Sequence, residues 1–244
     1  MNSSQYIIDV TLNRGNVPSF DEYPFNLDAL KNFDRLKLHP KVTYFIGENG
    51  SGKSTLLEAI AVALGFNAEG GTKNFNFETR EAEYDLSNYL RIGRGIRQPR
   101  DGFFLRAESF FNVATQVDEL GVAGSYGGKS LHEQSHGESF LALMTTRFRG
   151  DGIYLLDEPE AALSPQRQLA ILSRIHDLVR DSSQFIIATH SPILMAYPDS
   201  TIYECSPEGI HETTYEATEH YQVTRDFLMN RERMLRILLE DEVE

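Results

Sequence analysis

The sequence predicts an α/β fold with a mainly parallel sheet flanked by helices, because short apolar runs alternate with segments of helical periodicity. The apolar runs are 42–46, 103–105, 153–156 and 185–188. Each run is continuous rather than alternating, which is typical of strands buried on both faces of a parallel sheet. Short pieces of buried helix are the alternative interpretation, since periodicity alone does not separate the two.

Three segments carry the helical pattern. Residues 54–64 place apolar side chains at helical spacing. Ser164 and Pro165 predict the start of a second helix, because serine is a favoured N-cap and proline suits the first helical position. The apolar face of this helix continues to Val179, and residues 222–240 form the last candidate helix. Strands and helices therefore alternate along most of the chain.

Length and composition indicate one domain with an insertion. A chain of 244 residues can bury a self-sufficient core. Residues 63–150 are rich in Gly, Asn, Arg and aromatic side chains and differ from the segments on either side. We expect a single domain, 1–244, whose core comprises 1–62 and 151–244, with a lobe inserted at about 63–150.

Charge and cysteine content narrow the protein class. The formal net charge is −13, which disfavours unaided, non-specific binding to nucleic acid because such binding depends on cations that neutralise phosphates. Cys205 is the single cysteine, so an internal disulfide is excluded and a reducing compartment is expected. No apolar run reaches the length of a membrane span. We expect a cytoplasmic protein that does not enter the membrane.

Residues 47–54 match the phosphate-binding loop pattern G-x-x-x-x-G-K-[ST] between a predicted strand and a predicted helix. Glycines allow successive backbone N–H groups to point at phosphate oxygens, and the helix adds its positive end. Lys53 is expected to reach the β- and γ-phosphates, Ser54 to bind Mg²⁺ and Thr55 to reach the α-phosphate. A glycine-rich turn with an incidental lysine is the alternative. The predicted nucleotide-binding residues are Gly47, Glu48, Asn49, Gly50, Ser51, Gly52, Lys53, Ser54 and Thr55.

Two adjacent carboxylates follow the apolar run 153–156. Asp157 is expected to lie beside Mg²⁺, and Glu158 to orient and deprotonate the attacking water. An acidic turn at a strand end is the alternative. The residues that follow, Pro159-Glu160-Ala161-Ala162-Leu163-Ser164, argue against it.

Asp-Glu-Pro followed by Ala-Leu-Ser resembles the Walker B motif and D-loop of ABC-type ATPases, a family that includes transporter motors and the SMC/RecF-like repair ATPases. His190, 32 residues after Glu158, is similar to the switch histidine of that family, which contacts the γ-phosphate. The chain also resembles small stand-alone bacterial ATPases with a Ser-His-Gly-Glu-Ser version of the signature motif. The resemblance implies ATP and Mg²⁺ as cofactors, and Glu158, His190 and Lys53 as catalytic residues.

The segment Gln134-Ser135-His136-Gly137-Glu138-Ser139 resembles the family signature motif, usually Ser-Gly-Gly-Gln. Ser135 and Gly137 match it, whereas His136 and Glu138 replace a glycine and the glutamine. The resemblance implies that Ser135 and the backbone near Gly137 bind the γ-phosphate held by a second subunit. We therefore expect an ATP-sandwich homodimer.

Two family features have no clear counterpart. The glutamine loop is expected after the run 103–105, but this chain reads Arg-Ala-Glu-Ser there, and Glu108 is the candidate contact for Mg²⁺. The aromatic side chain that stacks on adenine is unassigned. Its candidates are Tyr6, Phe20, Tyr23 and Phe25.

An arginine cluster within residues 91–106 suggests a nucleic-acid or phosphate-facing patch, and a solvated loop balanced by carboxylates is the alternative. Its members are Arg91, Arg94, Arg97, Arg100 and Arg106. The 81 residues between Lys53 and Ser135 are too few for long coiled-coil arms, and the 54 residues after His190 are too few for an appended nuclease domain.

The leading functional hypothesis is Mg²⁺-dependent ATP hydrolysis by an ABC-type homodimer. One alternative is a nucleotide-gated interaction module that controls a protein effector, such as a nuclease or a toxin. A transporter motor is disfavoured by the missing glutamine, and a DNA-repair ATPase depends on the arginine cluster.

Overall fold

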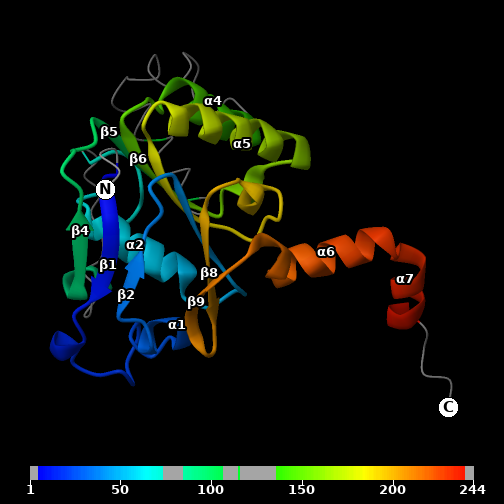
Figure 1. The fold of residues 1–244 in the computed structure, drawn as a ribbon, viewed down its shortest axis with the longest axis horizontal. Coiled ribbons are helices and arrows are strands. Elements are labelled where there is room, and N and C mark those ends of the chain that lie inside the picture. Colours follow the sequence, from blue (N-terminus) through cyan, green and yellow to red (C-terminus); the bar gives the residue numbers. More distant parts are fainter. Residues whose placement is uncertain (1–4, 74–84, 107–114, 116–135, 240–244) are drawn as a thin grey trace.

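The computed structural model describes residues 5–73, 85–106, 115 and 136–239 (Figure 1). Within these residues the strands form a six-stranded sheet, in the order β5-β6-β7-β3-β8-β9, and a three-stranded sheet, in the order β2-β1-β4. The larger sheet consists of β3 (Val42–Ile46), β5 (Asp101–Arg106), β6 (Gly152–Asp157), β7 (Gln184–Ala188), β8 (Thr201–Ser206) and β9 (Gly209–Thr213). The smaller sheet consists of β1 (Ile7–Leu12), β2 (Arg35–Lys37) and β4 (Leu90–Arg94).

The larger sheet confirms the predicted fold class. Strands β5, β6, β7, β3 and β8 are parallel, and only β9 runs antiparallel to its neighbour β8. All four predicted apolar runs lie in this sheet, and β3, β6 and β7 are buried along their full length. Burial on both faces explains why these strands are continuously apolar.

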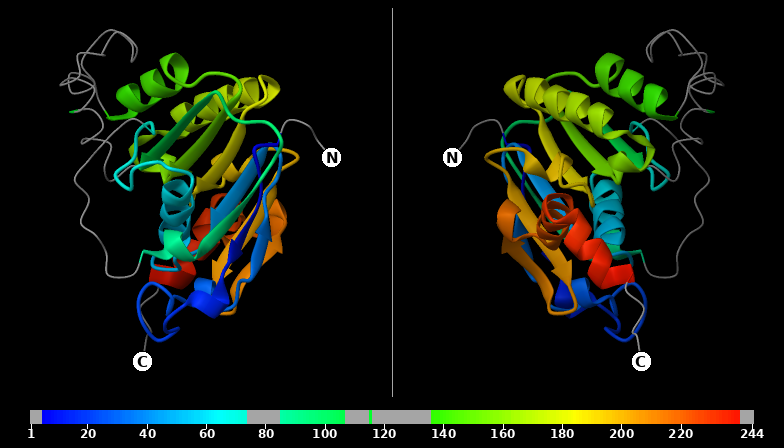
Figure 2. Two further views of the ribbon diagram at one scale, coloured as in Figure 1. Left: turned by 90° about the vertical axis from the view of Figure 1, so that its left-hand side faces the viewer. Right: turned by 90° about the vertical axis from the view of Figure 1, so that its right-hand side faces the viewer.

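Helices cover the larger sheet on both faces (Figure 2). The longer helices near the sheet are α2 (Lys53–Ala63), α4 (His136–Thr146) and α5 (Pro165–Arg180), and α1 (Asp28–Lys31) is a single turn. Tyr44 of β3 lies in an apolar cluster with residues of α4 and α5. Its neighbour Phe45 faces a second cluster formed by α2 and the smaller sheet. Successive residues of β3 therefore anchor opposite layers.

Short 3₁₀ helices occupy several of the connections. They are η1 (Arg14–Asn16), η2 (Leu86–Tyr89), η5 (Pro159–Ala162), η6 (Leu194–Ala196) and η7 (Tyr215–Ala217). The predicted start of α5 is confirmed: Ser164 is its N-cap, and its side chain accepts a hydrogen bond from the backbone N–H of Arg167 at 3.4 Å.

The predicted single helix at 222–240 is instead two helices, α6 (Glu219–Met229) and α7 (Arg231–Leu239). Asn230 separates them, because its backbone leaves the helical region with φ −128° and ψ 33°. Asparagine is a poor helix former and readily ends a helix. The two helices project away from the sheets (Figure 1).

Two strands within the predicted lobe, 63–150, pair with strands from outside it. Within that range, β4 pairs with β1 of the smaller sheet and β5 pairs with β6 of the larger one. Residues 90–94 and 101–106 therefore belong to the core sheets. Their backbone groups are satisfied by partners from outside the expected lobe. The division of the remaining chain into core and lobe stays a prediction.

None of the helices in the described part of the chain combines the length and hydrophobicity that crossing a bilayer requires.

Candidate functional site

The phosphate-binding loop joins β3 to α2 at the carboxyl edge of the larger sheet. Gly47, Gly50 and Gly52 all have positive φ, at 140°, 81° and 95°. Glycine is required at 47 for a second reason, because a Cβ atom there would lie 2.3 Å from the backbone oxygen of Cys205. The loop is therefore curled as phosphate binding requires, with the start of α2 directly behind it.

Two side chains at the start of α2 reach the end of β6. The side chain of Lys53 is 3% exposed; its Nζ donates to the backbone oxygen of Glu48 at 3.3 Å and lies 3.5 Å from Glu158 Oε1. Ser54 Oγ donates to Asp157 Oδ1 at 2.8 Å. The structure thus brings together the loop and the carboxylate pair, which are about 100 residues apart in the sequence.

Glu158 lies immediately beyond β6 in a strained conformation. Its φ of 48° and ψ of 51° fall in the left-handed region, which residues with a side chain seldom occupy outside functional sites. Its backbone N–H donates to the oxygen of Ala188 at the end of β7. Its carboxylate lies 3.3 Å from His190 Nε2, so the turn holds Glu158 between Lys53 and His190.

His190 follows β7 and is positioned from two sides. Its backbone N–H donates to Glu160 Oε1 at 2.5 Å, and its ring Nδ1 lies 3.1 Å from His220 Nε2. Burial, the nearby charge of Lys53 and His220 lower the pKa of His190, whereas Glu158 opposes this shift. Burial also lowers the pKa of His220. Both rings are therefore held in the neutral form near pH 7.

Glu160 and His220 are site residues that sequence reasoning did not identify. Glu160 is in the turn after the carboxylate pair, where burial raises its pKa, and its proximity to Glu158 in sequence is a signal that could have found it. His220 comes from α6, 30 residues beyond its partner. No local sequence motif identifies His220. Only the tertiary structure, in which the start of α6 packs next to His190, shows that it belongs to the site.

Arg106 is a third missed residue. It ends β5 directly opposite Asp157 in the register of β5 and β6. Its Nη1 donates to Glu58 Oε2 at 2.7 Å, and its Nε lies 3.7 Å from Asp157 Oδ2. The guanidinium thus places a positive charge beside the carboxylate whose other oxygen faces Ser54. Strand register, not a motif, places it there.

Two pockets flank the phosphate-binding loop. One, of about 400 Å³, is lined by Lys53, Ser54, Thr55, Glu158 and Tyr23, among others. The other, of about 550 Å³, is lined by residues 47–51 together with β8 and the start of α6. Both open at the edge of the sheet where parallel strands of α/β folds present ligand sites.

The four aromatic side chains that were candidates for stacking on adenine differ in their solvent exposure. Tyr6 and Phe25 are fully buried in the core. Phe20 is half-buried, with the guanidinium of Arg14 4.4 Å above its ring. Tyr23 is 64% exposed, lines the 400 Å³ pocket and has its hydroxyl 3.5 Å from Thr55 Oγ1. Tyr23 is therefore the only one of the four that is available to a ligand at this loop.

Two predicted site residues, Ser135 and Glu108, lie outside the described residues. Gly137 is in the first turn of α4, which packs with α5 on one face of the sheet. Neither pocket at the phosphate-binding loop is lined by α4.

The predicted arginine cluster is divided between separate places. Arg106 is in the site just described, whereas Arg91 and Arg94 are exposed on β4. Arg97 pairs with Asp151 at 2.8 Å, and Arg100 lies 3.9 Å from the same carboxylate. The structure therefore does not form one continuous patch from these five side chains.

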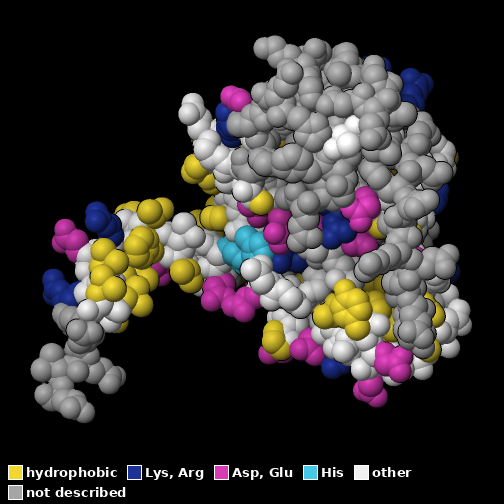
Figure 3. Space-filling view, turned by 180° about the vertical axis from the view of Figure 1, so that it is seen from behind, with side chains coloured by type: hydrophobic (Ala, Val, Ile, Leu, Met, Phe, Trp, Pro, Cys, Tyr) yellow, Lys and Arg dark blue, Asp and Glu magenta, His cyan; other side chains and the backbone are white. Residues whose placement is uncertain are grey.

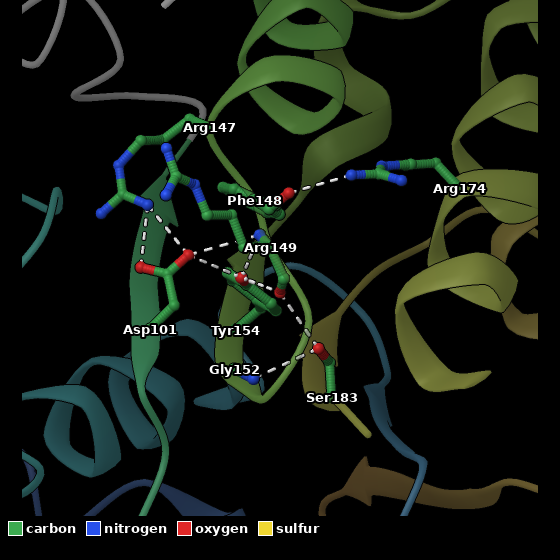
Figure 4. A network of polar contacts seen from close by, with 8 residues as sticks. All are labelled: Asp101, Arg147, Phe148, Arg149, Gly152, Tyr154, Arg174 and Ser183. Atoms are coloured by element: carbon green, nitrogen blue, oxygen red, sulfur yellow. Dashed lines mark hydrogen bonds and ion pairs between the residues drawn. The ribbon is translucent and has the colours of Figure 1, made fainter. Parts of the chain in front are cut away.

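Near Asp151, a polar network joins the first residues of β5, β6 and β7 (Figure 4). Tyr154 Oη donates to Asp101 Oδ2 at 2.9 Å, and Arg147 Nη1 donates to both oxygens of the same carboxylate. Ser183 Oγ donates to the backbone oxygen of Arg149. Burial and Asp101 raise the pKa of Tyr154, which stays a hydroxyl donor. The network stabilises the edge of the sheet opposite the phosphate-binding loop.

Comparison with known proteins identifies the family. A family model described as "AAA domain" matches residues 19–114, and one described as "AAA domain, putative AbiEii toxin, Type IV TA system" matches residues 122–196. The tungstate uptake system ATP-binding protein TupC of Peptoclostridium acidaminophilum is 30% identical over 62% of this chain and 75% of its own length. The energy-coupling factor transporter ATP-binding protein EcfA of Methanosphaera stadtmanae is 25% identical over 69% and 66%, respectively.

Among solved structures, cbiO1 from Clostridium perfringens, part of the ABC transporter complex cbiONQ, has a TM-score of 0.49 at 17% identity, covering 96% of this chain and 99% of that one. The sequence relatives, together with the loop, the carboxylate pair and the histidine that the fold assembles, establish that this chain belongs to the ABC-type P-loop ATPases and is an ATP-binding cassette domain.

Proposed function

We propose that this protein hydrolyses ATP with Mg²⁺ and works as a homodimer in which each nucleotide lies between the phosphate-binding loop of one copy and the signature segment of the other. The observation that carries the proposal is the convergence of Lys53, Ser54, Asp157, Glu158 and His190 at one sheet edge, with polar atoms 2.8–3.5 Å apart. The decisive experiment is a steady-state ATPase assay of the purified protein, with and without Mg²⁺. Absence of Mg²⁺-dependent phosphate release would overturn the proposal.

The donor set fits a divalent cation. Ser54 Oγ and Asp157 Oδ1 are hard oxygen ligands held 2.8 Å apart beside the loop, and Mg²⁺ prefers such ligands together with phosphate oxygens. Mg²⁺ at this place would neutralise the charge that develops on the β- and γ-phosphate oxygens. Arg106 supports this arrangement by placing a positive charge on the other side of Asp157.

Glu158 is the general base of the proposed reaction. Its carboxylate now lies between Lys53 Nζ and His190 Nε2, two groups suited to a γ-phosphate oxygen. When ATP binds, Lys53 and His190 contact the phosphate, and the carboxylate is left free to accept a proton from the attacking water. His190 Nε2 is buried and lies 3.3 Å from Glu158 Oε1 without a well-formed hydrogen bond, so it is placed to donate to a bound nucleotide.

His220 is a positioning residue in this scheme. A neutral imidazole carries one hydrogen, so His190 can donate from Nε2 only if its Nδ1 accepts. His220 Nε2, 3.1 Å from that Nδ1, supplies the matching hydrogen. The Glu158 carboxylate, 3.3 Å from His190 Nε2, favours the tautomer with the hydrogen on Nε2, and His220 supports that tautomer by acting as the donor to Nδ1.

Replacing His220 by alanine is expected to lower kcat about tenfold, because His190 loses the contact that supports its tautomer. His220→Gln restores a donor and should recover most of the activity. The ¹⁵N shifts of the His190 ring report the tautomer directly, and His211→Ala, at an exposed histidine on β9, is the matched control. An unchanged tautomer and kcat in His220→Ala would refute this role.

Tyr23 is proposed to contact the nucleotide beside Thr55. Tyr23→Ala is expected to weaken ATP binding about fivefold to tenfold through the loss of aromatic stacking, whereas Tyr23→Phe keeps the ring and should bind nearly as the wild type. Fluorescent-nucleotide titration measures the effect. Phe20→Leu, at a neighbouring ring outside the pocket, is the control.

The relatives favour a second candidate, the ATP-binding subunit of a transport system, because TupC and EcfA are both named as such subunits. Purification of the native protein from membranes together with a permease would support it. A nucleotide-gated module that controls an effector would instead bind ATP in a dimer and hydrolyse it slowly without its partner, which single-turnover kinetics can measure.

A further inference from the structure

Helices α6 and α7 form an arm that leaves the body of the protein and exposes most of its side chains (Figures 1 and 3). The two helices have 11 and 9 residues, and neither contains a buried residue. Helices this short are marginal in water unless they pack against other structure. Beyond the first residues of α6, the arm therefore calls for a contact that the described residues of one copy do not supply.

The arm is apolar to an unusual degree. Six of the ten exposed large hydrophobic side chains in the described residues lie on it, with exposed fractions of 54–78%. They are Val223, Leu228, Met229, Ile237, Leu238 and Leu239. With these exposed fractions the six side chains present several hundred Å² of apolar area per arm, on more than one face of the two helices, because residues 228–229 and 237–239 are consecutive. A contact that buries part of this area on each copy is on the scale of a small protein interface, in which about 800 Å² per partner, roughly half of it apolar, is typical.

The described part of the body offers no cluster of exposed large hydrophobic side chains to match. The other four exposed large hydrophobic side chains in the described ranges are Ile8 on β1, Tyr23, Ile96 before β5 and Leu169 on α5. They are single residues on different elements, and hydrophobic side chains scattered in this way are normal on any protein surface. Among the described residues, the apolar patch that complements one arm is the arm itself.

Charge argues for a protein surface over a membrane. The arm, 219–239, carries four arginines and three carboxylates, and residues 240–244 add four more carboxylates. Arg225 is also paired with Asp226 at 2.7 Å. An anionic bilayer attracts strongly basic amphipathic helices and would gain little from this segment.

We propose that the arm is a dimerisation surface that packs against the same arm of a second copy, related by a twofold axis. A twofold contact buries one patch on both copies, which meets the need for an apolar counterpart. The contact requires no nucleotide and is separate from the proposed ATP-dependent interface. The first turn of the arm follows the N-cap Thr218 and contains His220, which contacts His190. A contact between two arms would therefore link the histidine pairs of the two nucleotide sites.

The test is the molar mass of the full-length protein without nucleotide, measured by light scattering over a concentration series. The wild type is expected to be a dimer. The double variant Leu228→Glu/Leu238→Glu is expected to raise the dissociation constant by roughly 100-fold or more, because two charges from each copy, four in all, would lose their hydration at the contact. Leu169→Glu and Ile96→Glu, at exposed apolar positions on the body, should remain dimeric.

A monomeric wild type, or a double variant that stays dimeric, would overturn the proposal. So would a monomer whose arm binds phosphatidylcholine–phosphatidylserine vesicles, which would assign the surface to lipid. Circular dichroism of the variants checks that the fold is kept. The molar mass of Glu158→Gln, measured with and without ATP, separates this interface from the proposed function. If this variant is a dimer only with ATP, the arm contact is refuted and the ATPase proposal still stands.

Discussion

Glu158→Gln is expected to lower steady-state ATP hydrolysis by at least about 100-fold, because glutamine cannot accept the proton of the attacking water. The carboxylate lies 3.5 Å from Lys53 Nζ and 3.3 Å from His190 Nε2. Removing its charge leaves both groups available for the γ-phosphate. ATP binding should therefore be kept, and bound ATP should hold the dimer together. Phosphate release and nucleotide titration measure the two effects.

Glu212→Gln, at an exposed position on β9 outside both pockets, is the matched control for this change. It removes the same charge and should leave turnover unchanged. Hydrolysis by Glu158→Gln at the wild-type rate would exclude Glu158 as the general base. A large loss of ATP affinity would instead show that its main role is to hold the loop.

Lys53→Ala is expected to weaken ATP binding by roughly 10–100-fold, the effect of losing a charged hydrogen-bond donor worth about 1.5–3 kcal/mol. Lys53 Nζ is buried beside the curled loop, within reach of Glu48 and Glu158. Without it, the nucleotide loses a direct phosphate contact and Glu158 loses its cation. Isothermal titration with ATP and with AMP measures the difference, because the effect should be confined to nucleotides that carry β- and γ-phosphates.

Lys41→Ala provides the comparison for a lysine elsewhere on the same strand–loop–helix unit. Lys41 precedes β3 at the opposite end of the strand, where it pairs with Asp199. Its removal should not change ATP affinity. Equal ATP affinity in Lys53→Ala and wild type would show that phosphate binding does not occur at this loop.

Local patterns predicted the parts of the fold that depend on a few consecutive residues. The runs that became β3, β5, β6 and β7 were recognisable because both faces of each strand are buried. The three-stranded antiparallel sheet was not predicted, since its strands mix buried with exposed positions and lie far apart in the sequence. The break at Asn230 was missed because hydrophobic periodicity continues across it.

The residues of the candidate site also fall into those that the sequence identified and those that only the structure identified. The phosphate-binding loop and the Asp157–Glu158 pair could be read from the sequence, because one strand end and one helix start carry all their chemistry. His190 was identified by its resemblance to the switch histidine of the family, supported by its place after a predicted strand and after Glu158. His220 and Arg106 could not be found, because their roles depend on where α6 returns and on which residue β5 places opposite Asp157.

The sequence alone determined the α/β class and the residues of the phosphate-binding loop and the carboxylate pair, because a strand, a turn and a helix start form from neighbouring residues. Only the tertiary structure decided which of four aromatic side chains reaches the loop, and that Arg106 belongs to the site rather than to a surface patch. It also showed that α6 and α7 have no buried residue among the described parts of one copy. These results depend on contacts between distant segments, which are set by packing and strand register and are not encoded in any single window of the chain.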